Sequence, residues 1–461
     1  MTAPNGSKLW QKGVLNLAWH RKSLVLFFLI LSVPLNAAIN WNNNAGEDIT
    51  TSRINFLSSD RNNFLGAFAG LFYGSIPEVL ITWWQSLLLL QGLLTLAGLL
   101  LLFEHEIRNA SIRRVSLICG LAYVFVFLGM APTRDGAMIS FAIFGIGLIQ
   151  KPKAKQALVG IGIVAILISF SFRPWLSLAF APIIYKLIAM KFKTKKSILL
   201  ISCIPILLTP IFIENQVKNI WEFSPAYPQQ TVMIHDVSSS YCLSTSQSTR
   251  DKAFLQLQLI SKNEESLLRI CEFYKPSTWQ AVIVRNLTDS RISHLEPPIS
   301  KIQPERQQEF ETLQANWINL IVDDPGTYIQ NHLYFLTQIL ISGESSKLYF
   351  QTRVAEFNSS HRPAELFWVF ISLFQLPVQI LIRLHLLSPL ITILGLIIIN
   401  RRYRDSTYLS SISSYSIALT AWILITTLGF VSDNGRYTYL PIILLWAVFL
   451  KYSGNNQNEK G

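Results

Sequence analysis

The chain has 461 residues, of which 51% are hydrophobic and only 14% are charged, and its mean hydropathy is +0.36. Such a chain is too apolar and too poor in charge for an ordinary soluble domain, so the composition indicates a polytopic membrane protein. The formal net charge of +12 does not predict a nucleic-acid partner, because most Lys and Arg residues stand in short loops between apolar blocks. There they report the orientation of the chain in a membrane.

The first apolar run, Ser23 to Ile39, follows a basic N-terminus. It reads either as a membrane span or as a signal peptide that ends in the small residues Ala37 and Ala38. Under both readings the chain after Ile39 begins on the outer side of the membrane.

Six more apolar blocks precede a long polar insertion, and several are shorter than the roughly 20 residues that a span needs. They are Glu78–Phe103, Ile112–Met130, Asp135–Ile149, Gln156–Phe172, Trp175–Met190 and Ser197–Ile213.

Basic loops set the orientation of these blocks. The segments 108–114, 151–155 and 186–196 hold clusters of Lys and Arg on the side shared with the N-terminus, which is cytoplasmic by the positive-inside rule. The first loop, 40–77, and the long polar insertion that begins at Asn215 are therefore expected to face outwards.

The polar insertion, residues 215–362, is predicted to be a mainly helical extracytoplasmic lobe. Asp251–Cys271 has apolar residues near helical spacing, and Pro304–Ile341 shows a long helical pattern broken at Asp324-Pro325-Gly326. Cys242 and Cys271 lie in this outward lobe, where they form either a disulfide or two free thiols packed as small hydrophobes.

The C-terminal part, 363–461, returns to the membrane. The run Ala364–Asn400 reads as two short spans, or as an interfacial helix to about Leu386 followed by one span. The second reading places Arg401, Arg402 and Arg404 inside, and the block Leu409–Val431 then returns outwards. With the N-terminal bundle, 1–214, the predicted fold is all-α, with about ten or eleven spans and one lobe.

The first outward segment with candidate catalytic residues is the loop that holds Glu47 and Asp48. A carboxylate at the membrane surface is suited to act as a general base for an acceptor hydroxyl or amine, and Asp48 is the favoured candidate. The structural alternative is a solvated loop in which an acidic residue or Thr50 caps a short helix.

Two outer turns carry charged residues that are candidate functional residues. Arg134 and Asp135 stand between apolar blocks, and charged residues at such depth are functional candidates by default. The alternative is a helix start, with Thr133 or Asp135 at the cap and Arg134 extending to the headgroups. Arg173, between Phe172 and Pro174, holds a lipid phosphate or anchors a helix.

The last outward segment runs from Ser432 to Pro441 and leads into the final span. Arg436 offers forked donors that match phosphate oxygens, and Tyr437 follows it directly. The alternative is an Arg and Tyr belt of the kind found in many membrane proteins.

Together, the acidic first loop, the short-loop spans, the outer Arg-Pro turn, the helical lobe and the Asp-x-x-Arg-Tyr-x-x-x-Pro segment resemble the GT-C class of membrane glycosyltransferases. The stretch Leu313–Leu340 is also similar to a segment of bacterial proteins of this class. The resemblance implies that Asp48, or Glu47, is the base and that a polyprenyl-phosphate-linked sugar is the donor. It further implies that Arg436 and Tyr437 contact the donor or its phosphate.

The expected reaction needs a base for the acceptor and cations around the leaving phosphate. Arg436, Arg173 and Arg134 supply these cations, so a divalent metal is possible but not required. The sequence predicts no metal-ligating residues and indicates no certain cofactor. Two alternatives remain open: a glycan polymerase or ligase, which would use Arg291, His294 or His332, and a transport or assembly protein. The sequence names neither the sugar nor the acceptor.

Overall fold

The computed structural model describes residues 47–58, 66–77, 82–109, 111–130, 133–151, 155–191, 196–223, 229–261, 263–275, 306–341, 388–402, 406–429 and 439–452, with most of 22–33 and a few single positions between. Over these residues the regular structure is helical, with one isolated β-bridge between Ser261 and Ile299. The prediction of an all-α fold is confirmed.

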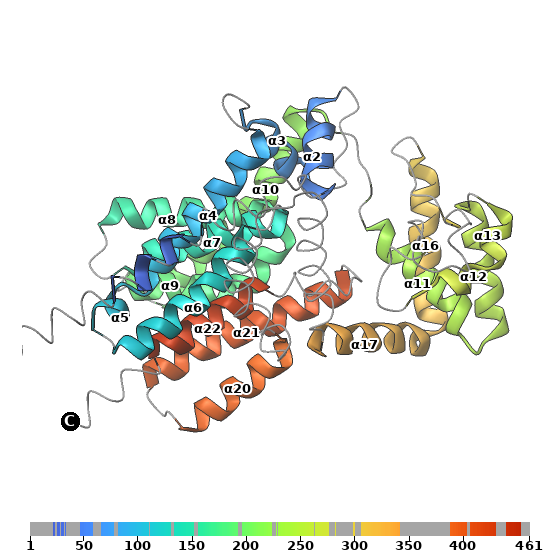
Figure 1. Ribbon diagram of the computed structural model, residues 1–461. Coiled ribbons are helices and arrows are strands. Elements are labelled where there is room, and N and C mark those ends of the chain that lie inside the picture. Colours follow the sequence, from blue (N-terminus) through green and yellow to red (C-terminus); the bar gives the residue numbers. More distant parts are fainter. Residues whose placement is uncertain are drawn as a thin grey trace, which may run out of the picture.

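Most of the helices form one bundle whose members follow the predicted apolar blocks (Figure 1). Before the lobe these are α4 (Trp83–Leu102), the short α5 (Glu104–Asn109), α6 (Ile112–Gly129), α7 (Arg134–Gln150), α8 (Gln156–Ser171), η1 (Pro174–Phe180), α9 (Ala181–Lys191) and α10 (Lys196–Ile220). After the lobe they are α20 (Pro389–Arg402), α21 (Ser406–Gly429) and α22 (Tyr439–Tyr452). The block predicted at 175–190 is not one helix, because it begins as a 3-10 helix after Pro174. The ambiguous segment 364–387 lies outside the described residues.

The centre of the bundle is held by close helix approach at glycines. A side chain on Gly98 of α4 would meet the backbone of Ile143 at 2.6 Å, and one on Gly145 of α7 would meet the carbonyl oxygen of Gly162 at 2.6 Å. Only glycine admits backbones this close, and small residues at helix contacts are a common packing device of membrane bundles. Ser169 adds a hydrogen bond from its hydroxyl to the Met138 carbonyl at 2.7 Å.

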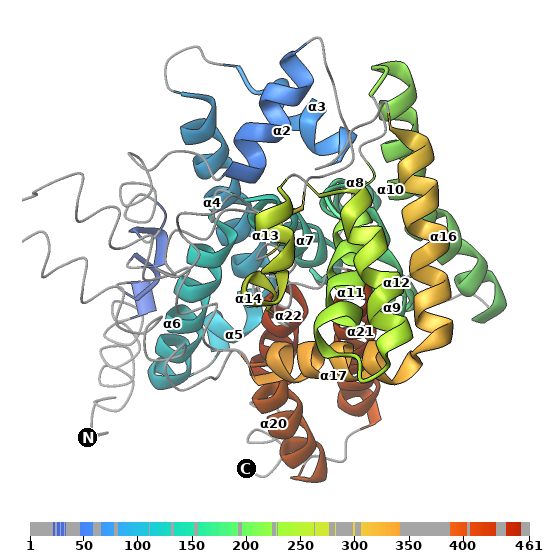
Figure 2. The same ribbon diagram turned by 90° about the vertical axis from the view of Figure 1, so that its right-hand side faces the viewer.

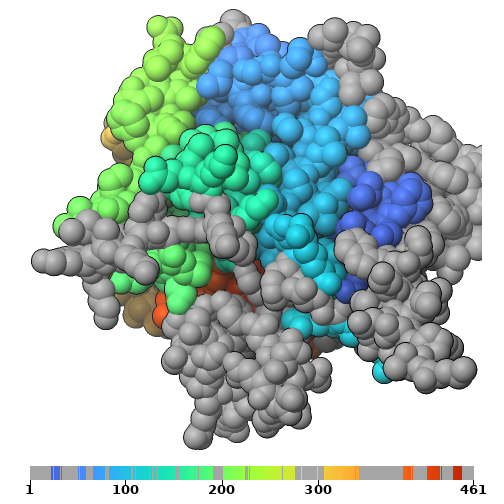
Figure 3. All heavy atoms as spheres, turned by 90° about the vertical axis from the view of Figure 1, so that its left-hand side faces the viewer, coloured from blue at the N-terminus to red at the C-terminus, as the bar shows by residue number. Residues whose placement is uncertain are grey.

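Within the described residues one helix, α4, is both long and apolar enough to cross a bilayer. Shorter apolar helices cover Gln156–Ser171, Leu176–Met190 and Ser413–Ile425. On the side of the bundle turned away from the lobe, α4, α8 and α10 lie on one face (Figure 3). Large apolar side chains are exposed on these helices, among them Leu93 at 58%, Ile161 at 51% and Ile204 at 51%.

Two short helices, α2 (Glu47–Leu57) and α3 (Ala67–Gly74), pack together at one end of the bundle (Figure 1). The rings of Phe68 and Phe72 on α3 lie 5.4 and 5.1 Å from the ring of Phe172, centroid to centroid. The first loop therefore sits directly over the turn that contains Arg173.

The lobe is formed by α11 (Gln230–Leu243), α12 (Gln247–Leu259), α13 (Glu264–Leu268), α14 (Ile270–Phe273), α16 (Gln307–Asp323) and α17 (Pro325–Ile341) (Figure 2). It has a hydrophobic core of its own, drawn from residues 227–320. The helical pattern predicted over 251–271 is divided among three helices, since Asn263 caps a new one by accepting from Ser266 N at 3.2 Å. The predicted break at Asp324-Pro325-Gly326 separates α16 from α17.

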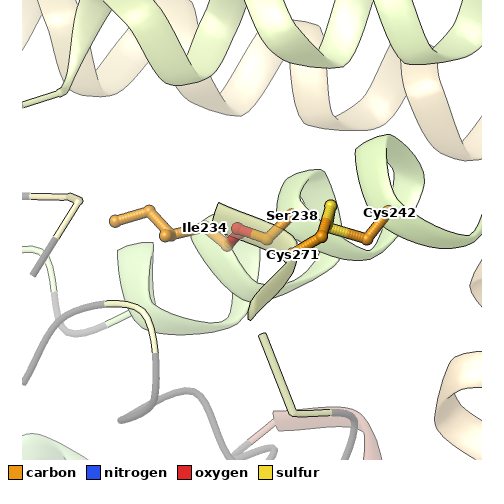
Figure 4. The surroundings of a disulfide bond; sticks show 4 residues. All are labelled: Ile234, Ser238, Cys242 and Cys271. Carbon is orange, nitrogen blue, oxygen red and sulfur yellow. A yellow bond between two sulfur atoms is a disulfide. The ribbon is translucent and has the colours of Figure 1, made fainter. Parts of the chain in front are cut away.

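A disulfide between Cys242 and Cys271 resolves the choice that the sequence leaves open (Figure 4). It joins the end of α11 to α14 across 29 residues of sequence, with the Cα atoms 5.4 Å apart. Cys119 and Cys203 are buried free thiols in the bundle. The bond therefore closes the lobe around its first three helices.

Helix α17 connects the lobe to the bundle. Its residues Phe335 and Ile339 belong to the bundle core, whereas Asn331, one turn earlier, faces α11. The Leu340 carbonyl accepts a hydrogen bond of 2.7 Å from the hydroxyl of Ser388, just before α20. Asn331, Phe335 and Ile339 are four residues apart, so they lie along one face of the helix. This face contacts the lobe at Asn331 and the bundle core at the next two positions.

Candidate functional site

A buried ion pair joins two of the predicted site residues. Arg173 donates from Nε to Asp135 Oδ1 at 3.2 Å and from Nη2 to Asp135 Oδ2 at 3.4 Å. The side chains are 7% and 3% exposed. A forked arginine–carboxylate pair fixes geometry as well as charge, so it holds the start of α7 against the turn before η1.

The start of α7 follows from local capping. Thr133 has an extended backbone, and its hydroxyl oxygen accepts from the Gly136 amide at 3.1 Å. Asp135 lies in the first turn, where a carboxylate is favoured by the helix dipole. The helix-start alternative predicted for this segment is therefore present, together with the ion pair.

Glu214, near the end of α10, brings a second carboxylate to this end of the bundle. Its oxygens accept from the Ala67 and Phe68 amides at 2.6 and 2.9 Å, the first two amides of α3. A methyl group on Gly66 would lie 3.7 Å from Glu214 Oε1 and 3.9 Å from Arg134 Nη1, so both side chains border that residue. We call Arg134, Asp135, Arg173 and Glu214 the bundle-end cluster.

The remaining predicted site residues are only partly described. Helix α2 begins at Glu47 and Asp48, and it packs on α3 above the bundle-end cluster, but the side chains of these two residues lie outside the described part of the chain. Arg436 and Tyr437 lie wholly outside it. The structure thus brings together Arg134, Asp135 and Arg173 and places the helix that bears Asp48 next to them.

A second polar centre lies where the lobe meets the bundle. Asp236 on α11 is 4% exposed, and both of its carboxylate oxygens are hydrogen-bonded. Oδ1 accepts from His332 Nε2 at 3.1 Å and from Asn331 Nδ2 at 3.3 Å, and Oδ2 accepts from Trp317 Nε1 at 3.0 Å. We call His235, Asp236, Asn331 and His332 the lobe network.

His332 ties this network to the bundle. Its Nδ1 lies 3.0 Å from the Thr427 carbonyl oxygen on α21. A carbonyl and a carboxylate both accept, so the ring donates from both nitrogens and is an imidazolium paired with the Asp236 carboxylate. The ring of Tyr328, one turn earlier on α17, lies 4.3 Å away, centroid to centroid.

The neighbouring histidine completes a closed set of hydrogen bonds. His235 Nε2 lies 3.1 Å from the Lys275 carbonyl oxygen, so this nitrogen carries the proton. Its Nδ1 then accepts from Asn331 Nδ2 at 3.3 Å, and Asn331 Oδ1 accepts from the Tyr274 hydroxyl at 2.6 Å. These contacts fix the orientation of the His235 ring beside Asp236.

The charges of the lobe network are stabilised mutually. Burial alone would raise the pKa of Asp236, but His235 and His332 lower it below its usual value. Burial alone would lower the pKa of His332, yet the hydrogen bond and charge of Asp236, with the Thr427 carbonyl, raise it above the usual value. The pair is therefore held in its ionised form.

Sequence reasoning named His332 within the glycan-ligase alternative and inside the stretch Leu313–Leu340, and it missed Glu214, His235, Asp236 and Asn331. The sequence signal that could have found these residues is the adjacent pair His235-Asp236. In the structure this pair lies on α11 within a run that is buried from Gln230 to Ser240. In the structure both nitrogens of His332 are engaged, which leaves it no lone pair to activate an acceptor. Arg291 and His294, the other ligase candidates, lie outside the described residues.

Across the described part of the chain, no three or more His, Cys, Asp or Glu side chains gather closely enough to hold a metal ion. The cations near the bundle end are arginines and Lys218, whose charge acts on Glu214. No family, curated protein or solved structure matches this chain.

Proposed function

We propose that this protein is a polytopic membrane glycosyltransferase that moves a sugar from a polyprenyl-phosphate-linked donor to an acceptor on the outer face of the membrane. The observation that carries the proposal is the meeting of Arg134, Asp135 and Arg173 at one end of the bundle, beneath the helix that begins with Glu47 and Asp48. In this reaction Asp48 removes the proton of the acceptor hydroxyl. The arginines balance the charge of the departing phosphate.

The membrane setting is supported by the exposed apolar side chains of the bundle. Leu93, Ile161 and Phe212 are each more than half exposed. An exposed apolar surface of this kind is unfavourable in water but suits lipid. We propose that both termini and the basic loops are cytoplasmic, and that the lobe and the bundle-end cluster are extracytoplasmic.

Labelling of intact cells tests this topology. Cysteines introduced at Ser277 in the lobe and at Lys153 in a basic loop should differ, with Ser277→Cys labelled by an impermeant maleimide and Lys153→Cys protected until the cells are permeabilised. Strong labelling at Lys153 in intact cells would reject the orientation, and the proposed site would then face the wrong compartment.

Sugar transfer in reconstituted membranes tests the chemistry. With radiolabelled polyprenyl-phosphate sugars as donors, Asp48→Asn should reduce turnover about 10²–10⁴-fold while donor binding is retained, because only the base is lost. Arg436→Ala should weaken donor binding by about 1.5–3 kcal/mol, and Arg436→Lys should recover part of it, since an ammonium keeps the charge but loses the fork. Turnover close to the wild-type value in Asp48→Asn would contradict the assignment of Asp48 as the general base.

A further inference from the structure

Helices α2 and α3 are too short to be stable on their own. They have 11 and 8 residues, whereas an isolated helix of fewer than about 12–15 residues is marginal in water. Both views of the ribbon show them side by side at one end of the bundle (Figure 1, Figure 2). Their placement therefore depends on contacts with each other and with neighbouring helices. This placement matters because α2 carries Asp48 in its first turn.

Arg53 on α2 links three helices. Its Nη1 group donates to the carbonyl oxygen of Tyr73, near the end of α3, and to that of Ile76 at 3.1 Å. Its guanidinium carbon lies 4.8 Å from the ring centroid of Trp83, the first residue of α4. The last carbonyl groups of a helix lack partners within the helix and carry partial negative charge, so a cation is favoured there. One side chain thus ties α2 to both α3 and α4.

An aromatic contact fastens the C-terminal part of α2. The ring of Phe56 lies 5.0 Å from the ring of Trp221 and 6.3 Å from that of Phe223, centroid to centroid, and both of these residues follow α10. Phe56 and Phe223 share a small hydrophobic core with Val217 of α10 and Ala67 of α3. This core holds the end of α2, and Arg53 is the anchor that lies closer to its start.

The location of Asp48 depends on the angle at which α2 lies. Asp48 stands eight residues before Phe56, which is about 12 Å along the helix at about 1.5 Å per residue. A tilt of about 5° about Phe56 would therefore move the start of α2 by about 1 Å. A misplacement of about 1 Å can slow a reaction about 10²-fold. An anchor between Phe56 and Asp48 is thus suited to control a general base at the start of α2.

We propose that Arg53 is a positioning residue, which fixes the tilt of α2 through the carbonyls of α3 and the ring of Trp83 and so holds Asp48 next to the bundle-end cluster. Its importance for turnover rests on the proposed glycosyltransferase function, in which Asp48 is the base. In this role Arg53 does not contact the donor. It therefore differs from Arg134 and Arg173, which balance the charge of the phosphate.

Sugar transfer by the full-length protein in reconstituted membranes gives the first readout. Arg53→Met keeps the length of the side chain but removes the charge and the donors, so it should lower kcat about 10–10²-fold with the KM and the binding of the donor unchanged. Arg53→Lys should recover part of the loss, because an ammonium keeps the charge but lacks the planar fork. The matched control is Arg113→Met at an exposed position of α6, which should leave kcat unchanged.

A double variant separates positioning from general damage to the protein. Asp48→Asn has no base left to position, so adding Arg53→Met to it should cause no further loss of turnover. A further 10-fold loss in the double variant would overturn the positioning role. Weaker donor binding in Arg53→Met with kcat unchanged would also overturn it, because Arg53 would then act on the donor.

Distances between spin labels test the placement of α2 without any turnover. The labels are attached at Thr50→Cys on α2 and Leu93→Cys on α4, in a background in which Cys119 and Cys203 are replaced by alanine. Pulsed electron paramagnetic resonance should give a narrow distribution of distances when Arg53 is present and a broader or shifted one in Arg53→Met. The distribution in Arg113→Met should match that of the wild type. Identical distributions in Arg53→Met and the wild type would reject the proposal.

The two readouts also distinguish this inference from the proposed function. If the wild type transfers no sugar but Arg53→Met changes the distances, Arg53 anchors α2 and the transferase function fails. If the wild type transfers sugar and Arg53→Met equals it in kcat and in distances, the positioning role alone is overturned. Should Arg53→Met fail to fold, Arg53→Lys decides, since a lower kcat with unchanged donor binding supports the role and an unchanged kcat rejects it.

Discussion

The bundle-end cluster and the lobe network both bury a carboxylate against a cation, but they are built from different parts of their helices. Asp135 stands in the first turn of α7, Arg173 precedes η1, and Glu214 binds the first amides of α3. Asp236 and His332 lie in the middle of α11 and α17, and their polar atoms are all bonded. Charged residues at helix ends lie beside loops, where ligands bind. Charged residues that are enclosed at mid-helix positions stabilise the fold.

The largest expected effect breaks the lobe network. His332→Ala leaves the Asp236 carboxylate buried without its cation, which should destabilise the lobe by about 3–5 kcal/mol. Hydrogen exchange should quicken in α11 and α17 and stay unchanged in α4. Gln330→Ala, at an exposed position of the same helix, is the control and should change little.

A double variant sharpens the same test. Asp236→Asn should destabilise the protein less in the His332→Ala background than alone, because in that background the amide replaces an unpaired charge. Additive effects of the two substitutions would show that the pair does not hold the lobe to the bundle.

The disulfide gives the next largest effect. Changing both Cys242 and Cys271 to Ser should destabilise the lobe by about 3.5 kcal/mol, because the bond closes a 29-residue loop and restricts the unfolded chain. The bundle end contains no part of this loop. Thermal melting followed by proteolysis of the lobe measures the effect, and Cys203→Ser in α10 serves as a control for thiol removal.

Gly66→Ala addresses the bundle end. Gly66 precedes α3 with φ of 97°, a conformation that costs other residues about 1–3 kcal/mol. The substitution should loosen the start of α3 and its bonds to Glu214, and thereby reduce sugar transfer without changing exchange in the lobe. Gly160→Ala on α8, where a methyl group would meet no atom within 4 Å, should be neutral or slightly stabilising.

The sequence predicted most of the fold because apolar runs and Pro or Gly breaks are local signals. The starts of α6, α7 and α8 fall within a residue of the predicted blocks, and Asp324-Pro325 ends α16 as expected. The prediction missed the 3-10 start after Pro174, where the chain turns tightly before α9. It also joined three lobe helices into one, since apolar spacing alone does not reveal the cap at Asn263.

The candidate sites were less predictable because they depend on contacts between distant segments. Arg173 was singled out as a partner for phosphate, but its buried partner Asp135 stands 38 residues earlier. Asp236 meets His332 across 96 residues, and no local spacing indicates that pair. Glu214 stands between the predicted block Ser197–Ile213 and the polar insertion, and only the fold places it on the amides of α3.

The smallest expected effect is the pH dependence of the lobe network. The pKa of His332 is raised in the folded protein, so its contribution is complete below the unfolded value of about 6.5 and is lost as the pH rises through the folded value. The pKa of Asp236 is lowered, so its contribution is complete above about 3.8 and is lost as the pH falls through the folded value. Hydrogen exchange in α11 and α17 should therefore be slowest between these limits and should quicken as the pH rises above about 6.5, after correction for the intrinsic exchange rate.

The variant His332→Gln is the test of this assignment. It should abolish the increase in exchange at alkaline pH because glutamine does not titrate, whereas the pH dependence of exchange in α4 should be the same in both proteins. An alkaline change that persists in His332→Gln would assign it to another group and contradict the imidazolium at the contact with Thr427.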